Sequence, residues 1–351
     1  MFPETQLRRR VAGGVLLLLC LAGCGDADGG PGPTPADARS FDDLVASALS
    51  EDPAIWYDSS PDDQGRAVTE AFATRFPGAS VRHVRLVGGL DIAARMVLEA
   101  RTRGEAADVA TLAAEQAHGL HERKLLAEVP WQALGVNRAM VAAPHALATA
   151  TAVFVLLYNP ELVAAPPASW EDLLAPDWAG RFGTWVSPHA LVQLVPSLGN
   201  EQATRYAARF AAQDPVLFRS TFPLVQAIAA GDLAAGVGVW HAAKPLISAG
   251  APVRVSRLSP TPVSTLYTVV AAGATSPNTA RLFAVWLASP EGALAYETAT
   301  GRGNRRVAGT ETAAFLEGAE VSEFPFSEVA AASEWMARFG AELRSGRTVR
   351  P

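Results

Sequence analysis

The sequence predicts an α/β fold built on a parallel sheet. Three observations support this fold class. Short apolar runs alternate with longer stretches in which apolar residues recur at helical spacing. Glycine and proline pairs separate several of these segments, as they do at the ends of helices and strands. The resulting order of strand, helix, strand, helix, strand is typical of parallel strands joined by right-handed crossovers.

The first half of the pattern can be followed in chain order. The predicted segments are a strand at Ala54–Tyr57, a helix at Gln64–Phe76, a strand at Val81–Val87, a helix at Asp91–Arg103 and a strand at Ala107–Leu112. In the first helix Val68, Ala71 and Phe72 share one face, and Pro77-Gly78 ends it. Further on, the segments predicted are a helix at Phe222–Ala230, a strand at Leu266–Val270 and a last helix at Ser327–Arg344.

The N-terminus is typical of a secretory signal. Arg8, Arg9 and Arg10 precede the apolar stretch Val15–Leu21, which is too short to span a bilayer. The small residues before Cys24 resemble the bacterial lipobox, in which this cysteine is lipidated after cleavage. Residues 1–23 are therefore predicted to be a lipoprotein signal peptide, and Cys24 a lipid anchor. The alternative is an ordinary secretory signal with an incidental cysteine.

The segment after Cys24 is rich in glycine, proline and aspartate and has no apolar periodicity. It cannot bury enough surface to offset its ordering entropy, so residues 24–43 are predicted to be a flexible tether. Apart from Cys24, the only cysteine is Cys20, within the signal. The mature body is thus expected to have neither a disulfide framework nor a thiolate metal site.

Charge and length narrow the functional classes. The chain has 29 basic and 35 acidic residues, and removing residues 1–23 takes away three arginines and one glutamate, which leaves a net charge of −8. This charge argues against a nucleic-acid partner. The remaining length exceeds one typical domain core and predicts two lobes. The excess of arginine over lysine is explained by composition bias and is assigned no role.

Several motifs resemble the bacterial extracellular solute-binding proteins of ABC transporters, of the ferric-iron and aminoethylphosphonate type. The resemblance covers roughly residues 53–308, and its most characteristic block lies in the middle of the chain. The motifs are Tyr57-Asp58-Ser59-Ser60, Phe76-Pro77-Gly78, Ala107-Asp108-Val109, Tyr158-Asn159-Pro160-Glu161-Leu162-Val163, Pro167-Ala168-Ser169-Trp170-Glu171-Asp172-Leu173-Leu174, Trp178-Ala179-Gly180-Arg181, Ala229-Ala230-Gly231-Asp232-Leu233-Ala234-Ala235-Gly236 and Ala288-Ser289-Pro290-Glu291-Gly292-Ala293.

The resemblance implies a type II periplasmic-binding-protein fold, with two α/β lobes, a hinge and a ligand cleft between the lobes. Lobe 1 is predicted to comprise residues 44–148 and 266–318. Lobe 2 is predicted to comprise residues 149–265 and 319–351. The chain is expected to cross between them near Ala148–Phe154 and to return near Thr265–Val270.

The function implied is that of the substrate-binding component of an ABC importer. A monomer tied to the membrane by its N-terminal lipid would capture a small polar or anionic solute and deliver it to the permease. Three alternatives remain: a ferric-iron receptor, a sensory or scaffold lipoprotein that kept the binding fold, and an enzyme on the same frame.

Polar or flexible residues follow the predicted strands, at places equivalent to the ligand loops of the family. Hydroxyl groups and free N–H donors at helix starts favour an anion or a polar oxygen. The expected ligand-binding residues are Ser59, Ser60, Gly88, Gly89, Thr111, Ser187, Ser220 and Thr221. The alternative for each hydroxyl residue is a helix N-cap with no other role.

Trp240 and His241 complete the expected ligand-binding set. They stand where ferric-binding members of the family have a pair of tyrosines, and the chain has only five tyrosines. This departure places ferric iron below an organic or phosphorylated solute. The indole could stack on a ring or cover an organic cation, and the imidazole could hydrogen-bond a phosphate. The alternative is a core tryptophan beside a surface histidine.

No catalytic, metal or cofactor motif is present in the sequence. There is no Gly-x-Ser-x-Gly, His-Glu-x-x-His or Walker-type segment. The acidic pairs Asp62-Asp63 and Glu171-Asp172 are explained as charges that complement helix dipoles. His118 and His121 have a spacing that could ligate a metal, but a solvated helix face explains them better. No enzyme activity, metal or cofactor is expected.

Overall fold

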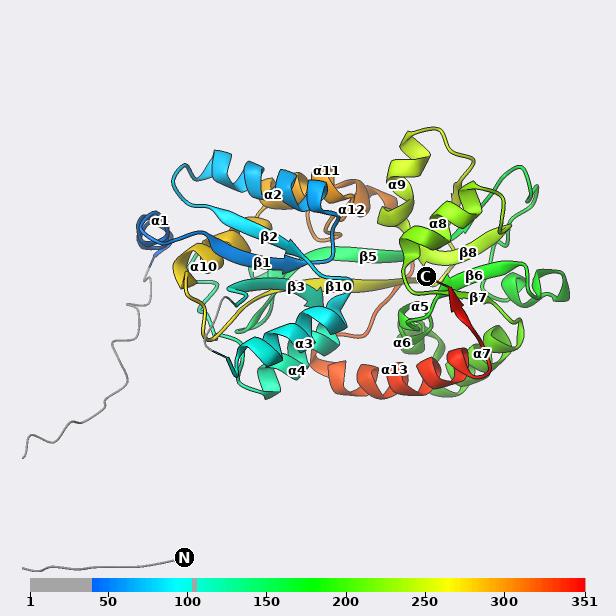
Figure 1. Cartoon of the computed structure of the whole chain (residues 1–351). Coiled ribbons are helices and arrows are strands. Elements are labelled where there is room, and N and C mark those ends of the chain that lie inside the picture. The colour runs from blue at the N-terminus through cyan, green and yellow to red at the C-terminus, as the bar shows by residue number, and fades with distance from the viewer. Residues whose placement is uncertain (1–39, 103–105, 351) are drawn as a thin grey trace, which may run out of the picture. The chain divides into compact units, whose positions relative to one another are not determined.

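A 12-stranded mixed sheet forms the centre of the chain (Figure 1). A computed structural model describes residues 40–102 and 106–350, which belong to a single unit. The main strand order is β12-β7-β6-β8-β5-β10-β3-β1-β2, and three short strands pair outside this path. The strands are β1 Ala54–Asp58, β2 Val81–Arg85, β3 Val109–Ala113, β4 Val141–Ala143, β5 Ala146–Tyr158, β6 Phe182–Trp185, β7 Val216–Phe218, β8 Ala235–Val239, β9 Arg254–Ser256, β10 Thr261–Val270, β11 Val321–Ser322 and β12 Val349–Arg350.

Helices cover both faces of this sheet (Figure 1). The α-helices are α1 Phe41–Ala48, α2 Asp62–Arg75, α3 Gly89–Glu99, α4 Ala114–Glu122, α5 His189–Val192, α6 Val195–Leu198, α7 Asn200–Ala212, α8 Thr221–Ala229, α9 Trp240–Ser248, α10 Pro277–Leu287, α11 Pro290–Thr300, α12 Glu311–Phe315 and α13 Val329–Arg344. The short 3₁₀ helices are η1 Arg138–Met140, η2 Asp172–Leu174, η3 Pro176–Trp178 and η4 Phe326–Glu328. No described helix is long and apolar enough to cross a membrane.

The predicted α/β fold class is confirmed. β1 pairs in parallel with both β2 and β3, and α2 and α3 form the crossovers between these strands. The element bounds differ by a few residues from those predicted. β10 begins at Thr261 rather than Leu266, and α3 begins at Gly89 and ends at Glu99 rather than continuing from Asp91 to Arg103. The glycine N-cap, Gly88, has a φ of 92°, which the missing Cβ permits.

The two segments predicted to cross between lobes are neighbouring strands. β5 pairs antiparallel with β10, so that Leu266 lies opposite Ala150 and Thr265 opposite Thr151. Nearly every residue of both strands is buried. On one side this pair is continued by β3, β1 and β2, and on the other by β8, β6, β7 and β12. The lobe bounds proposed from the sequence remain a prediction.

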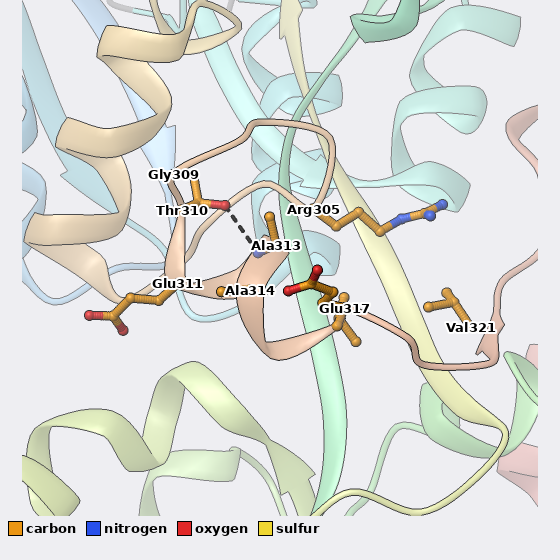
Figure 2. A pocket seen from close by; sticks show the side chains of 9 residues that line it. Arg305, Gly309, Thr310, Glu311, Ala313, Ala314, Glu317 and Val321 are labelled. Atoms are coloured by element: carbon orange, nitrogen blue, oxygen red, sulfur yellow. Dashed lines mark hydrogen bonds between the residues drawn. The ribbon is translucent and has the colours of Figure 1, made fainter.

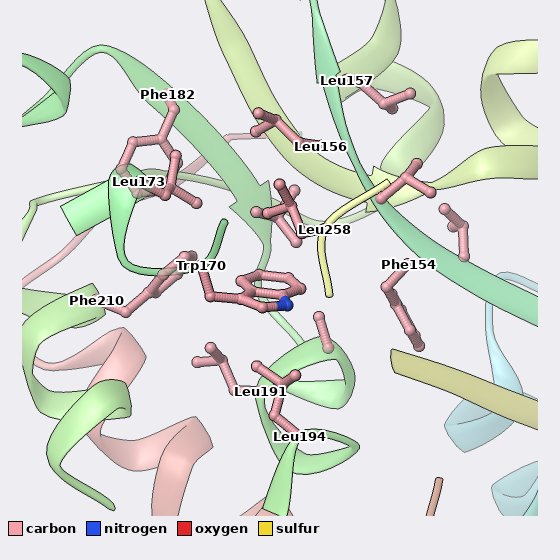
Figure 3. Close-up of a cluster of buried hydrophobic side chains, with 14 of the residues drawn as sticks. Phe154, Leu156, Leu157, Trp170, Leu173, Phe182, Leu191, Leu194, Phe210 and Leu258 are labelled. Carbon is pink, nitrogen blue, oxygen red and sulfur yellow. The ribbon is translucent and has the colours of Figure 1, made fainter. Parts of the chain in front are cut away.

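β5 also connects separate hydrophobic clusters. Its C-terminal half, residues 152–157, belongs to a cluster with Phe182 and Phe210 (Figure 3). Its N-terminal half contributes Leu147 and Ala150 to a second cluster that contains Trp56 and Phe283. One strand therefore contributes to the cores on both sides of the sheet centre.

The motif most characteristic of the family has a structural role. Trp170 lies within the cluster drawn in Figure 3 and donates from Nε1 to the carbonyl of Pro260 at 2.8 Å. Asp172 accepts the backbone N–H groups of Ala168 and Ser169, both at 3.0 Å, and these bonds lower the pKa of its carboxyl. Glu171 pairs with Arg209 at 2.8 Å. These contacts give each member of the acidic pair a structural partner.

The described chain begins with helix α1 and ends with helix α13 followed by the short strand β12. Ser40 caps α1, so residues 40–43, which were included in the predicted tether, form the cap and first turn of a helix. The predicted signal peptide, Cys24 and the remainder of the tether lie outside the described residues. At the other end, α13 packs Ala332, Phe339 and Leu343 into the cluster around Phe182.

His145 is a buried titratable group in the α4 region. It is 6% exposed, and its ring stacks on that of His121 with 3.7 Å between centroids. The centroid of its ring also lies 5.7 Å from that of Phe326, with the two rings tilted by 51°. Burial, with the charges of His121 and His118, lowers the pKa of His145 to about 4. No group of three His, Cys, Asp or Glu side chains within the described ranges could hold a metal ion.

The stability of the protein is predicted to fall as the pH decreases from 6.5 to about 4. His145 has its ordinary pKa of 6.5 in the unfolded chain and about 4 in the folded chain. The unfolded state therefore binds the proton first, and stability that is present above pH 6.5 is lost over this window. His145→Phe keeps a ring against His121 and should flatten the dependence measured by urea unfolding. An unchanged slope would contradict this assignment.

Candidate ligand-binding cavity

A cavity of about 600 Å³ lies where several strands end. Residues just after β1, β2 and β3 line one part of it, and residues after β6, β7 and β8 line another. The first turns of α3, α4, α8 and α9 also reach it, and α13 contributes Met336 and Arg344. Ligands of open α/β sheets bind beyond the carboxyl ends of the strands, so this is the expected place for a site.

Most residues predicted from the sequence lie together in this cavity. The lining includes Ser59, Gly88, Gly89, Thr111, Ser187, Ser220, Thr221 and His241. Ser220 caps α8, which is the role given above as the alternative to ligand binding. It also borders the cavity. The structure therefore brings these loops together, whereas the binding role of each residue remains a prediction.

Ser60 and Trp240 do not line the cavity. Ser60 is fully buried and accepts a hydrogen bond from Arg302 at 2.7 Å. Trp240 stacks on Phe315, with 4.1 Å between centroids and 19° between planes. Its ring also lies 4.1 Å from Nζ of Lys244. In this structure Trp240 thus has the packing contacts expected of a core tryptophan, which was the alternative to a ligand contact.

A buried ion pair at the base of the cavity was not predicted. Arg302 Nη1 donates to both carboxylate oxygens of Asp58, at 3.0 and 3.1 Å, and Nη2 donates to Ser59 at 3.1 Å. The two residues are 244 positions apart, and both are buried. Asp58 could have been suspected because it directly follows a buried strand. Nothing in the sequence pattern points to Arg302.

Tyr296 and His241 complete this network. The Tyr296 hydroxyl donates to Asp58 at 3.1 Å, and burial together with the Asp58 charge raises the pKa of Tyr296. Burial lowers the pKa of Arg302, but its partners Asp58 and Tyr296 raise that pKa by more, so the guanidinium stays charged. Its Nε donates to Nε2 of His241 at 3.4 Å. Burial and the charges of Arg302 and Lys244 hold the pKa of His241 well below 6.5, so this imidazole is neutral.

Three parallel rings form another part of the cavity wall. The His189 ring lies between those of Trp185, at 5.1 Å and 6°, and Phe154, at 6.4 Å and 15°. Ser187 and His189 Nδ1 form a hydrogen bond of 2.7 Å. All four residues line the cavity. The sequence indicated Ser187 only, because ring stacking between residues of separate elements, here β5, β6 and α5, leaves no periodic signal.

One acidic residue faces these rings. Glu115 Oε2 lies 3.8 Å from Nε2 of His189, which is an ion-pair distance but too long for a hydrogen bond. Burial raises the pKa of the Glu115 carboxyl. The interaction with His189 and a hydrogen bond from the Glu115 backbone lower that pKa by more, so the overall shift is downward. This carboxylate is therefore ionised at neutral pH.

Cations without partners also border the cavity. Arg85, Arg219 and Arg344 line it, are exposed, and form no ion pair within the part of the chain that the structure describes. The acidic lining residues are Asp58, Asp91 and Glu115, of which Asp58 is already paired with Arg302. The charges still free to meet a ligand are therefore mainly positive.

A second hollow, of about 660 Å³, lies at the surface near α12 (Figure 2). It is lined only by residues between 305 and 321, and its charged residues Arg305 and Glu311 extend in opposite directions in Figure 2. Thr310 caps α12 here by accepting the N–H of Ala313 at 3.1 Å. This hollow contains none of the predicted site residues.

Comparison with known families identifies the class of protein. Residues 67–313 match the family described as bacterial extracellular solute-binding protein. The chain belongs to this family. Members of this class and the similar solved structures are binding proteins rather than enzymes, and such proteins are the solute-binding components of ABC transporters. No curated protein matches the sequence.

Solved structures of periplasmic binding proteins share the fold of this solute-binding protein. Iron-bound HitA from Pseudomonas aeruginosa is 19% identical with a TM-score of 0.70, and the match covers 83% of this chain and 99% of HitA. AfuA from Actinobacillus pleuropneumoniae, with bound fructose-6-phosphate, is 17% identical with a TM-score of 0.70, over 84% and 99% of the two chains. A periplasmic thiamin-binding protein is 18% identical with a TM-score of 0.67, over 84% and 96%. These likenesses confirm the type II periplasmic-binding-protein fold.

Breaking the buried ion pair should destabilise this solute-binding protein. Asp58→Ala leaves Arg302 charged and buried, so it is predicted to lower the free energy of unfolding by about 3–5 kcal/mol. The matched control is Arg75→Ala, which removes an ion pair to Glu291 whose side chains are about half exposed, and it should cost about 1 kcal/mol or less. Urea unfolding measures both. Equal losses would show that the pair does not stabilise the cavity base.

Proposed function

We propose that this protein captures a small polar or anionic organic solute in the cavity of about 600 Å³ and delivers it to the permease of an ABC importer. The observation that carries the proposal is the convergence of strand-end loops on one cavity whose arginines Arg85 and Arg219 form no ion pair with any described residue. Arg85 and Arg219 come from strands on opposite sides of the β5–β10 pair, so an anion between them would be attracted from both sides.

The size and shape of the cavity favour an organic molecule. Cavities of roughly 300–1,000 Å³ hold drug-sized ligands, and the volume here lies within that range. A bare metal ion would leave most of it empty. The apolar lining residues Phe154, Phe222 and Met336 would remain without a partner.

Ferric iron is the second candidate, because iron-bound HitA has the same fold. Fe(III) prefers hard oxygen ligands, but all five tyrosines lie in the described part of the chain and none of them lines the cavity. The only nitrogen of His241 with a lone pair, Nε2, faces the Arg302 guanidinium. A cation bound at this nitrogen would be repelled by Arg302, which supports an organic ligand instead.

Capture would involve closure of two lobes over the solute. The sequence divides the chain into residues 44–148 with 266–318 and residues 149–265 with 319–351. Under this division, β5 and β10 carry the crossing segments, and Ser59 and Trp185 belong to different lobes. Hinged closure around a ligand is the usual motion of two-lobed binding proteins.

Lipidation of Cys24 would hold the protein at the membrane. A tether over residues 24–43, shortened by the part that belongs to α1, would let the body reach the permease while keeping its effective concentration high. A sensory or scaffold lipoprotein would use the same anchor without a permease. A gene for a permease beside the gene for this chain would favour transport.

Thermal unfolding with added solutes tests the binding function. Aminoethylphosphonate, glucose 6-phosphate, phenylacetate, thiamine, spermidine and ferric citrate form a suitable set. An anionic organic solute should stabilise the full chain by about 2.7 kcal/mol at 100 times its dissociation constant. Stabilisation by ferric citrate alone would contradict the proposal.

A blocking variant locates the binding in the cavity. Ser187→Trp places a large side chain among the cavity-lining residues and should abolish the thermal shift. Ser197→Trp introduces the same side chain at an exposed position of α6 outside the cavity and should leave the shift unchanged. If the shift persisted in Ser187→Trp, the solute would bind elsewhere.

A further inference from the structure

In a stack of rings the inner faces cover one another, so Trp185, which is half-buried at the end of the stack and lines the cavity, is the ring that offers the cavity a flat face. Trp185, His189 and Phe154 are nearly parallel, with interplanar angles of 6° and 15° between neighbours. The edge of Trp185 is fixed, because its Nε1 donates to the carbonyl of Arg219 at 3.0 Å. The Ser187 hydroxyl likewise fixes His189 at 2.7 Å. The planes are therefore set before any ligand arrives.

A positively charged residue adjoins Trp185 in the cavity. Arg219, whose carbonyl holds the indole, lines the cavity with an exposed side chain and has no ion pair within the described ranges. The following residues, Ser220 and Thr221, line the cavity at the start of α8. The first turn of α8 contains no acidic residue to offset its dipole. An acid group beside Trp185 would therefore meet a favourable field.

Apolar side chains also line the cavity, whereas the one carboxylate beside the rings, Glu115, lies 3.8 Å from His189. Leu112, Leu266, Phe222 and Met336 border the same cavity. A ligand hydroxyl group that lay against these four side chains would lose its hydrogen bonds to water without replacement, at a cost for each such group. A flat, unsaturated body would instead gain contact area against them and aromatic stacking on Trp185.

From this juxtaposition of a half-exposed indole and an adjoining cation, we propose that the ligand is an organic acid with a planar, unsaturated body. Its flat body stacks on the face of Trp185 that His189 does not cover. Its carboxylate or phosphate lies toward Arg219 and the start of α8. This inference rests on the proposed function, since it names the class of solute that the cavity takes.

Isothermal titration calorimetry of the full chain tests separately whether the planar body and the acid group of the ligand are needed for binding. The probes are indole-3-acetate, phenylacetate and phenyl phosphate as planar acids, cyclohexylacetate as a non-planar acid, indole as a planar neutral compound, and glucose 6-phosphate. The planar acids should bind, and cyclohexylacetate and indole should bind at least tenfold more weakly. The carboxylate and phosphate probes show which acid group is preferred.

Variants locate the two interactions. Trp185→Ala should weaken indole-3-acetate binding at least tenfold, whereas Trp185→Phe should retain most of the affinity. Trp178 is the matched control, because it is also a half-buried tryptophan packed on the same hydrophobic cluster but does not line the cavity, and Trp178→Ala should leave affinity unchanged. Arg219→Gln should reduce the preference for indole-3-acetate over indole.

The outcomes separate this inference from the proposed function. Equal binding of cyclohexylacetate and phenylacetate, or binding of glucose 6-phosphate without any planar acid, overturns the planar-acid inference and leaves solute capture intact. An unchanged affinity in Trp185→Ala also overturns the inference. Failure of every organic anion, including those of the thermal-shift set, overturns the proposed function as well.

Discussion

The antiparallel pairing of β5 with β10 is the constraint on which the rest of the structure depends. It places two long, buried strands at the centre of the sheet, in a register that joins residues 147–153 to residues 263–268. The parallel strands on either side extend from this pair, and their ends meet at one cavity. A slip of one residue would turn every side chain of β5 to the opposite face and would separate the hydrophobic clusters it connects.

Within this frame, charge is distributed unevenly around the cavity. The Arg302 charge is largely neutralised by Asp58, so the main effect of the guanidinium is to orient Ser59 and His241. The exposed Arg85 and Arg219 have no such partner within the described residues and remain available to a ligand. Buried pairs of this kind cost desolvation energy and are retained where they fix the geometry of a site, which is how we interpret the pair here.

The sequence predicted those parts of the fold that depend on local order. β1, β2 and β3 were recognisable because apolar runs and helical periodicity alternate there, and Ser59, Gly88 and Thr111 followed from their places at strand ends. Arg302 was missed because its partner Asp58 lies 244 residues away, and no periodicity reports such a contact. Trp240 was expected at the ligand, but its stacking on Phe315 depends on a segment 75 residues later, whose position only the folded chain reveals.

The central claim is that one solute binds at the ends of these strands, and a crystal structure of the full chain with the solute that gives the largest thermal shift tests it most directly. The account predicts ligand electron density in the cavity of about 600 Å³, in contact with both Ser59 and Trp185. Density in the surface hollow beside Glu311, with the strand-end cavity holding only water, would contradict it.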